Sequence, residues 1–328
     1  MSKEIFYPNL YHGKFKRKDY FEGWYFKVVD AKRQQVFAFI PGISYGTSET
    51  TSHSFIQLLR GNEAEFNYFK YNIVDFSWNN KKFNIGVGRN SFSLDQMSID
   101  INEDNLKIFG TINFKNLIKW PDSFISPGSM GYYNFIPFME CYSQVCAIDV
   151  DLMGSLNVNG EVIDFNNGKG YIEKNWGKSF PLSWIWVQCN CFKNYKAALS
   201  CSIGHIPFLR SSFRGFLIGF LFNNKFYKFT TMNKSTINIV EDNGDVELTI
   251  QNNKYKMYIH TKTNKDRFIR CYGPKGSEMI PMLEENLKGI VHLRLIDLTK
   301  DVVIFEDEGE CTGIEYGGEQ KNILDYIH

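Results

Sequence analysis

The sequence predicts an all-β protein, and three observations lead to that expectation. Short runs of alternating apolar residues recur along the chain, separated by Asn, Gly, Asp and Lys, a pattern typical of antiparallel strands and tight turns. Aromatic residues make up 16% of the 328 residues, which argues against disorder. Many strands of similar length with tight turns indicate antiparallel barrels or sandwiches. A barrel also removes the exposed edges that aromatic and β-branched strands would leave.

The expected strands follow one another through the chain. Three hairpins are the clearest, and two of them have the two-residue turn signals Asn159-Gly160 and Asn223-Asn224. Only two short segments, 282–288 and 319–327, have a composition that favours helix. The strands are expected over residues 22–29, 35–40, 54–59, 65–73, 82–87, 107–114, 156–158, 161–165, 216–222, 225–229, 246–250, 255–259, 267–272, 289–298 and 302–305.

Charge and targeting signals exclude several classes of protein. Lys plus Arg number 37 and Asp plus Glu number 36, so the net charge of +1 gives no basic field for nucleic acid. The first nine residues hold no apolar run suited to a signal peptide, and no stretch approaches ~18 apolar residues. The seven Cys are therefore expected as reduced thiols in a cytoplasmic protein. Contact with a membrane surface and the oligomeric state are left open.

No metal site is expected. Cys189 and Cys191 share one face of an extended segment, but no second pair stands at the spacing of metal ligands. The six His form no HxxxH or HxH group. The chain also lacks a phosphate-binding GxxxxGK[ST] loop and a GxSxG nucleophile elbow.

A weak internal sequence similarity bears on the number of domains. The Trp-rich strands 22–28 and 184–188 place Trp24 and Trp184 160 residues apart. This spacing indicates two similar β-domains in tandem, and coincidence in an aromatic-rich chain is the alternative. We place the domains at 1–172 and 173–328. No Pro/Ser-rich linker separates them, so we expect them to pack tightly together.

The most unusual segments hold carboxylates among aromatic residues. The stretch 127–142 is almost wholly apolar or aromatic and has a single carboxylate, Glu140. The stretch 170–190 crowds Glu173, Lys174, amides and three Trp into one short region. An acid, a base and aromatic walls in one place favour a site for a hydrophobic ligand.

These motifs resemble the tocopherol cyclase family. The resemblance rests on FEGWYF at 21–26, on EKNWG…FP..W.WVQCN.F at 173–192 and on IEYGG at 314–318, so it spans nearly the whole chain. It implies two lipocalin-like barrels with a hydrophobic ligand, an architecture similar to that of carotenoid hydratase-like and pericyclase-like proteins. Plant-type members are longer in the first half. They also have a His after the carboxylate that matches Glu140, where this chain has Tyr142.

Chroman ring closure needs a protonated acid, walls that stabilise a cation, and exclusion of water, but no cofactor or metal. Burial keeps a carboxyl protonated, and aromatic faces stabilise cations. The candidate acids are Glu140, Glu173 and Glu22. For each the alternative is a structural role: an outward-facing strand residue, an ion pair, or a carboxylate that holds backbone amides. The candidate substrate-binding residues are Trp24, Tyr25, Tyr142, Lys174, Asn175, Trp176, Trp184, Trp186, Gln188 and Asn190, each with a core or hydrogen-bonding role as the alternative.

Three functions remain open at this point. The leading expectation is an enzyme that protonates an alkene of a prenylated quinol or other isoprenoid and thereby cyclises or hydrates it. The second is a non-catalytic carrier of a hydrophobic ligand. The third is a pericyclase or isomerase that folds a polyene by shape alone. A buried carboxyl at the ligand distinguishes the first function from the other two.

Overall fold

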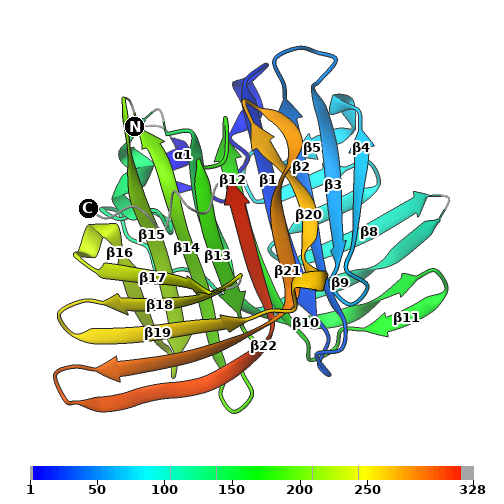
Figure 1. The fold of residues 1–328 in the computed structure, drawn as a ribbon. Coiled ribbons are helices and arrows are strands. Elements are labelled where there is room, and N and C mark those ends of the chain that lie inside the picture. Colours follow the sequence, from blue (N-terminus) through cyan, green and yellow to red (C-terminus); the bar gives the residue numbers. More distant parts are fainter. Residues whose placement is uncertain (1–2, 104, 138, 209, 243, 319–328) are drawn as a thin grey trace. The chain divides into compact units, whose positions relative to one another are not determined.

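The computed structural model describes residues 3–103, 105–137, 139–208, 210–242 and 244–318, and these form an almost entirely β structure (Figure 1). The all-β prediction is confirmed. The helical elements are short, namely α1 (Lys3–Phe6) and the 3₁₀ helices η1 (Gly13–Phe15), η2 (Ile73–Asp75), η3 (Gly131–Phe135), η4 (Thr231–Asn233) and η5 (Lys265–Arg267).

The first sheet has twelve antiparallel strands in the order β4-β3-β2-β1-β12-β10-β9-β8-β7-β6-β5, and β11 pairs with β10 beside this path. Its strands are β1 (Tyr20–Val29), β2 (Val36–Tyr45), β3 (His53–Arg60), β4 (Glu65–Tyr71), β5 (Phe76–Trp78), β6 (Asn84–Val87), β7 (Asn90–Ser93), β8 (Gln96–Glu103), β9 (Leu106–Ile118), β10 (Cys141–Val158), β11 (Glu161–Asp164) and β12 (Lys169–Gly177).

The second sheet has ten antiparallel strands in the order β16-β15-β14-β13-β22-β21-β19-β18-β17, and β20 pairs with β21 beside this path. Its strands are β13 (Ser183–Cys189), β14 (Ala197–Phe208), β15 (Ser211–Phe222), β16 (Lys225–Thr230), β17 (Thr236–Asp242), β18 (Asp245–Gln251), β19 (Tyr255–Lys262), β20 (Ile269–Lys275), β21 (Glu278–Asp297) and β22 (Val302–Gly318).

Both sheets follow one plan. In each, the first strand pairs with the last, β1 with β12 and β13 with β22, and the next three strands continue as a meander on one side. The two ends of each path are consecutive strands joined by a 3₁₀ helix, β4 to β5 through η2 and β16 to β17 through η4. This shared order is the curled meander of a barrel-type sheet.

The chain divides into two compact units. The first comprises Met1–Phe180 and Tyr272–Pro281, and the second comprises Pro181–Cys271 and Met282–His328. The boundary expected between residues 172 and 173 falls inside β12, whereas the structure divides the chain after Phe180. The sequence also gives no sign that residues 272–281, at the turn between β20 and β21, belong to the first unit.

One predicted helix is wrong. Residues 282–288 lie within β21, where Leu283 lies opposite Gly317 and Glu284 lies opposite Tyr316 of β22. The helix-favouring composition of this segment is overridden because residues 283–286 pair in register with residues 314–317 of β22. The other predicted helix, 319–327, lies outside the described residues.

The core of the first unit is aromatic. Phe26 lies 5.3 Å from Phe92 and 5.9 Å from Phe114 between ring centroids, and Trp24 stacks on Phe76 and Phe83. Trp24 and Phe26 are completely buried. Because strands alternate, the even-numbered residues of β1 face this core and the odd-numbered residues face the other way.

Candidate active site

The ladder between β1 and β12 brings two predicted motifs together. Trp24 lies opposite Lys174, and Tyr25 lies opposite Glu173. Directly opposed residues share a face of the sheet, and the face changes at each residue along a strand. Trp24 belongs to the core, so Trp24 and Lys174 lie on the inner face, whereas Tyr25 and Glu173 lie on the outer face.

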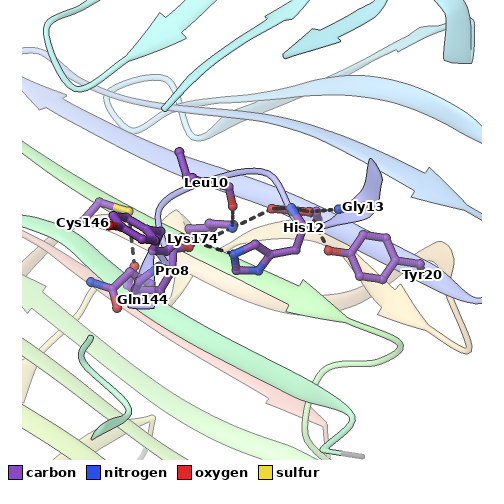
Figure 2. A network of polar contacts seen from close by, with 10 residues as sticks. Pro8, Leu10, His12, Gly13, Tyr20, Gln144, Cys146 and Lys174 are labelled. Carbon is purple, nitrogen blue, oxygen red and sulfur yellow. Dashed lines mark hydrogen bonds and ion pairs between the residues drawn. The ribbon is translucent and has the colours of Figure 1, made fainter. Parts of the chain in front are cut away.

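The inner face holds a buried ion pair. The Nζ of Lys174 lies 2.6 Å from Oε1 of Glu22, and both side chains have no exposed surface. Glu22 also accepts hydrogen bonds from the backbone N–H of His12 at 3.0 Å, from that of Gly13 at 3.1 Å and from the hydroxyl of Tyr20 at 2.5 Å (Figure 2). Each carboxylate oxygen therefore has at least two donors.

Lys174 is equally well satisfied. Its ammonium donates to the carbonyl of Pro8 at 2.9 Å and to that of Leu10 (Figure 2). It also lies 4.4 Å from the ring centre of Trp176 and 5.5 Å from that of Trp24, as a cation over aromatic faces. The ion pair therefore fastens the N-terminal segment to β1 and β12.

Two further rings surround Trp176. The imidazole of His12 meets it edge-on with 4.7 Å between centroids, and Tyr142 stacks on it at 5.5 Å. Burial lowers the pKa of His12, and the nearby ammonium of Lys174 lowers it further. His12 is therefore neutral at physiological pH. The hydroxyl of Tyr142 donates to the carbonyl of Ile136 at 2.8 Å, so it too has a structural partner.

The environment of Glu22 does not suit a catalytic acid. Burial raises the pKa of its carboxyl, while Lys174 and the hydrogen bonds from Tyr20 and His12 oppose that shift. The ammonium of Lys174 is paired with one oxygen, and backbone and hydroxyl donors bind the carboxylate as well, so Glu22 serves to hold the N-terminal segment. The structural alternative, a carboxylate that holds backbone amides and pairs with a lysine, describes Glu22 better than the predicted catalytic role.

Glu173 lies in a different environment on the outer face. It is 5% exposed, and its oxygens accept from the hydroxyl of Tyr171 at 2.6 Å, from Oγ of Ser143 at 3.1 Å and from Nδ2 of Asn175 at 3.2 Å. Lys27, 1% exposed, lies opposite Tyr171 on this same face. No pattern in the sequence singled out Lys27, Tyr171 or Ser143.

The carboxylate predicted in the 127–142 stretch is at the surface. The side chain of Glu140 is exposed, and its backbone carbonyl accepts from the N–H groups of Lys178 at 2.7 Å and Ser179 at 3.2 Å. The strand β10 begins only at Cys141, so Glu140 precedes the ladder instead of facing the core. An exposed carboxyl lacks the burial that keeps a general acid protonated, so Glu140 does not fit the buried acid that was expected.

In the second unit, the Trp residues of β13 lie on one face. Trp184, Trp186 and Gln188 alternate with Ile185 and Val187, and all five are buried. Trp186 lies opposite Glu315 of β22, and the indole N–H of Trp184 donates to the carboxylate of Glu315. Asn190, 5% exposed, follows the strand. Trp184 and Trp186 thus lie beside a carboxylate that was not predicted, and Gln188 lies on the same face of β13.

Glu315 has a second carboxylate as its neighbour. Glu285 of β21, which has no exposed surface, lies directly opposite it across the ladder. Burial raises the pKa of the Cys271 thiol, and the charges of Glu285 and Glu315 raise it further. The signal that could have identified Glu315 was the IEYGG motif. Glu285 could not be identified from the sequence, because the composition of residues 282–288 predicted a helix there.

The two units share an Ile-Glu pair in the last strand of each ladder. Tyr25 opposite Glu173 in the β1–β12 ladder corresponds to Trp186 opposite Glu315 in the β13–β22 ladder. Both carboxylates follow an Ile, at 172 and 314. Matching the two Ile-Glu pairs therefore aligns Tyr25 with Trp186, whereas the sequence similarity aligned Trp24 with Trp184. Trp24 is a core residue.

Among the described residues, no group of three or more His, Cys, Asp or Glu side chains is arranged to hold a metal ion. Within the same part of the chain, every helix is too short or too polar to cross a membrane.

Comparison with known proteins places these residues in a family. The sequence profile described as Tocopherol cyclase-like matches residues 101–318, which include Glu173, Glu285 and Glu315. The chain is 26% identical over 196 residues to the Oryza sativa subsp. japonica protein named "Probable tocopherol cyclase, chloroplastic". That alignment covers 57% of this chain and 42% of the rice protein, so the chain matches less than half the length of this relative.

Two solved structures share the fold. CghA matches with a TM-score of 0.61 at 9% identity, covering 94% of this chain and 90% of CghA. Kievitone hydratase from Nectria haematococca matches with a TM-score of 0.50 at 13% identity, covering 90% of this chain and 87% of the hydratase. At these sequence identities, the comparisons show a shared fold and nothing more.

Proposed function

The chain belongs to the tocopherol cyclase-like family, and on that premise we propose that it is an enzyme of the cyclase or hydratase type, with Glu173 as the proton donor. The carboxyl proton adds to a trisubstituted alkene of a prenylated quinol or other isoprenoid, and a tertiary cation forms. The phenol oxygen captures the cation to close a chroman ring, or water captures it to give a tertiary alcohol. The captured O–H group then loses a proton, which restores the acid.

The observation that carries this proposal is the burial of Glu173 among hydroxyl and amide partners. Burial favours the neutral form of a carboxyl, which is the form that an acid catalyst needs. The hydroxyls of Tyr171 and Ser143 lie within hydrogen-bond distance and offer a path for the returning proton. Tyr25, directly opposite on the same face, supplies an aromatic ring of the kind that stabilises a cation.

The carrier and the pericyclase-type template remain the alternatives. A carrier needs no buried carboxyl at its ligand, and a template acts by shape, so its rate does not depend on a proton donor. Glu315 is the second candidate acid because it is paired with Glu285. A neighbouring carboxylate disfavours ionisation of a carboxyl, which suits the protonated form that an acid catalyst needs.

The experiment compares Glu173→Gln with the wild type on a panel of prenylated quinols and phenols. Product is followed by liquid chromatography coupled to mass spectrometry, because hydration adds the mass of one water, whereas cyclisation leaves the mass unchanged and is detected as a changed retention time. We expect turnover by Glu173→Gln to fall by ~100-fold or more, the usual scale of general acid catalysis. Ligand binding, followed by Trp fluorescence, should persist.

Glu140→Gln is the matched control. Its side chain is exposed, so this variant should turn over like the wild type. Normal turnover by Glu173→Gln would refute Glu173 as the acid. If Glu315→Gln then lost activity, the acid would be in the second unit. If both variants retained activity, a templating site would replace acid catalysis.

A further inference from the structure

The first unit exposes large apolar side chains near its N-terminus. Phe15 is 79% exposed, Phe124 74% and Ile125 82%, and Tyr7 and Tyr132 are also more than half exposed. Scattered apolar residues are normal on a surface, but a contiguous exposed patch marks a place of interaction. These side chains therefore indicate an interaction surface only if they adjoin one another.

Ring contacts join two of them, Phe124 and Tyr132, through Phe6 and Phe135. Phe6, the last residue of α1, stacks on Phe124 with 4.9 Å between centroids and 9° between ring planes. Phe6 also lies 6.2 Å from Phe135 of η3, and Phe135 lies 6.4 Å from Tyr132. The N-terminal segment and the segment before β10 thus form one continuous aromatic surface.

A basic cluster lies at residues 14–18, separated from Tyr7 by six residues in the sequence. Lys14, Lys16, Arg17 and Lys18 flank Phe15, and all five side chains are exposed. The four cations stand out in a protein whose net charge is +1. The ammonium of Lys14 lies 5.2 Å from the ring centre of Phe15, and Arg17 donates to the carbonyl of Lys16 at 2.8 Å.

Acidic groups are fewer here. The sequence neighbours of the cluster and the patch include Asp19, which is half-buried, and Asp122, which is exposed. Residues 3–19 contain five Lys or Arg and two Asp or Glu, and residues 119–132 contain one of each sign, so these two segments together have an excess of positive charge.

The same ion pair described above holds this surface in place. Glu22 binds the backbone N–H groups of His12 and Gly13, and Lys174 binds the carbonyls of Pro8 and Leu10. These anchors lie between the aromatic residues at 6–7 and the basic cluster at 14–18. Residues 8–13, which connect these two parts, are therefore fixed to β1 and β12.

We propose that this surface, made of Tyr7, Lys14–Lys18, Phe124, Ile125 and Tyr132, docks on an anionic lipid surface. Apolar side chains that enter the boundary between head groups and acyl chains gain burial, while the adjacent cations meet the lipid phosphates. A nucleic acid offers anions but no apolar layer for Ile125 and Phe124. The combination of exposed apolar and basic residues fits a lipid surface on both counts.

The test measures cosedimentation of the full chain with vesicles. Vesicles of equimolar phosphatidylserine and phosphatidylcholine should bind the protein, whereas phosphatidylcholine alone should bind it weakly, and added salt should release it. Lys14→Gln/Lys16→Gln should weaken partition by about 25-fold, since each cation contributes about fivefold. Phe124→Ser/Ile125→Ser should also reduce binding, through the lost apolar burial.

Matched controls exist on the same unit. Lys81→Gln/Lys82→Gln removes two exposed cations, and Val74→Ser removes a residue that is 87% exposed, both outside the proposed surface. These variants should bind vesicles like the wild type. Thermal unfolding of every variant checks that it folds.

Three results would overturn the proposal. They are absence of binding to anionic vesicles, equal loss in the control and surface variants, and surface variants that change self-association but not vesicle binding. The last result would assign the surface to a second copy of the chain. The assay needs no turnover, so Glu173→Gln should still bind vesicles. A finding that Glu173 is not the catalytic acid would therefore leave this proposal intact.

Discussion

Lys174→Met removes one partner of the buried ion pair and leaves the other in place. Methionine is close to lysine in length, so it preserves most of the packing against Trp176 but loses the ammonium. The carboxylate of Glu22 loses its 2.6 Å partner, and the carbonyls of Pro8 and Leu10 lose their donor. The variant therefore removes the charge of the side chain while keeping its volume nearly unchanged.

The expected cost follows from these contacts. Breaking a buried ion pair from one side costs about 3–5 kcal/mol, because it leaves an uncompensated charge in a medium of low polarity. Glu22 keeps its bonds from His12, Gly13 and Tyr20, so we expect a loss of about 3 kcal/mol. In a unit of this size that corresponds to a Tm lower by roughly 6–12 °C.

Thermal unfolding followed by near-UV circular dichroism measures the effect, because Trp24 and Trp176 flank the ammonium. The two units can unfold separately, so the transition that carries this signal is the one to compare. Adding Glu22→Gln to Lys174→Met should restore part of the stability, since the unpaired charge is then gone.

Lys169→Met on the same strand is the control. Lys169 pairs with Asp149 and Asp151 at 2.8 Å, but its side chain is 25% exposed. Partial exposure limits the value of such a pair to about 1 kcal/mol or less. Equal losses of stability in Lys169→Met and Lys174→Met would refute the reasoning that burial makes the contribution of the Glu22–Lys174 pair large.

Two more predictions concern stability. Burial lowers the pKa of His12 from 6.5 to about 2, so the unfolded chain binds the extra proton first as the pH falls. The stability from neutral His12 is thus present above pH 6.5 and lost below it, by about 1.4 kcal/mol per pH unit, and His12→Gln should flatten that slope in denaturant titrations between pH 7 and 5. Gly317→Ala places a Cβ 2.0 Å from the ring of Trp184, which must move, so we expect a loss of about 1–3 kcal/mol and a changed Trp emission. Gly204→Ala, on the other side of Trp184 with its nearest contact at 3.5 Å, should change neither.

Much of the strand arrangement could be predicted from local pattern. Asn223 and Asn224 both adopt positive φ, as a two-residue hairpin turn requires, and Asn159-Gly160 does the same. The segment 282–288 shows the limit of such reasoning. Its Met, Leu, Glu and Lys favour helix, and only the presence of β22 beside it makes it a strand. No local pattern reveals a partner strand that lies beyond a turn of the chain.

The candidate acids show the same division between sequence and structure. The sequence identified Glu22, Glu140 and Glu173 because each lies among aromatic residues. Alternation also required that Glu173 and Lys174 face opposite ways. It did not say which of the two faces the core, because that depends on the register between β1 and β12, far apart in the chain.

The sequence by itself determined the β class, the hairpin turns and the motifs that match the family. Only the tertiary structure decided that Glu22 is held by Lys174, that Glu140 is exposed, that Glu173 is buried among hydroxyls and that Glu285 lies opposite Glu315. The physical reason is that propensity and alternation act over a few residues. The burial and the partners of a carboxylate are set by strands that meet after the chain has folded.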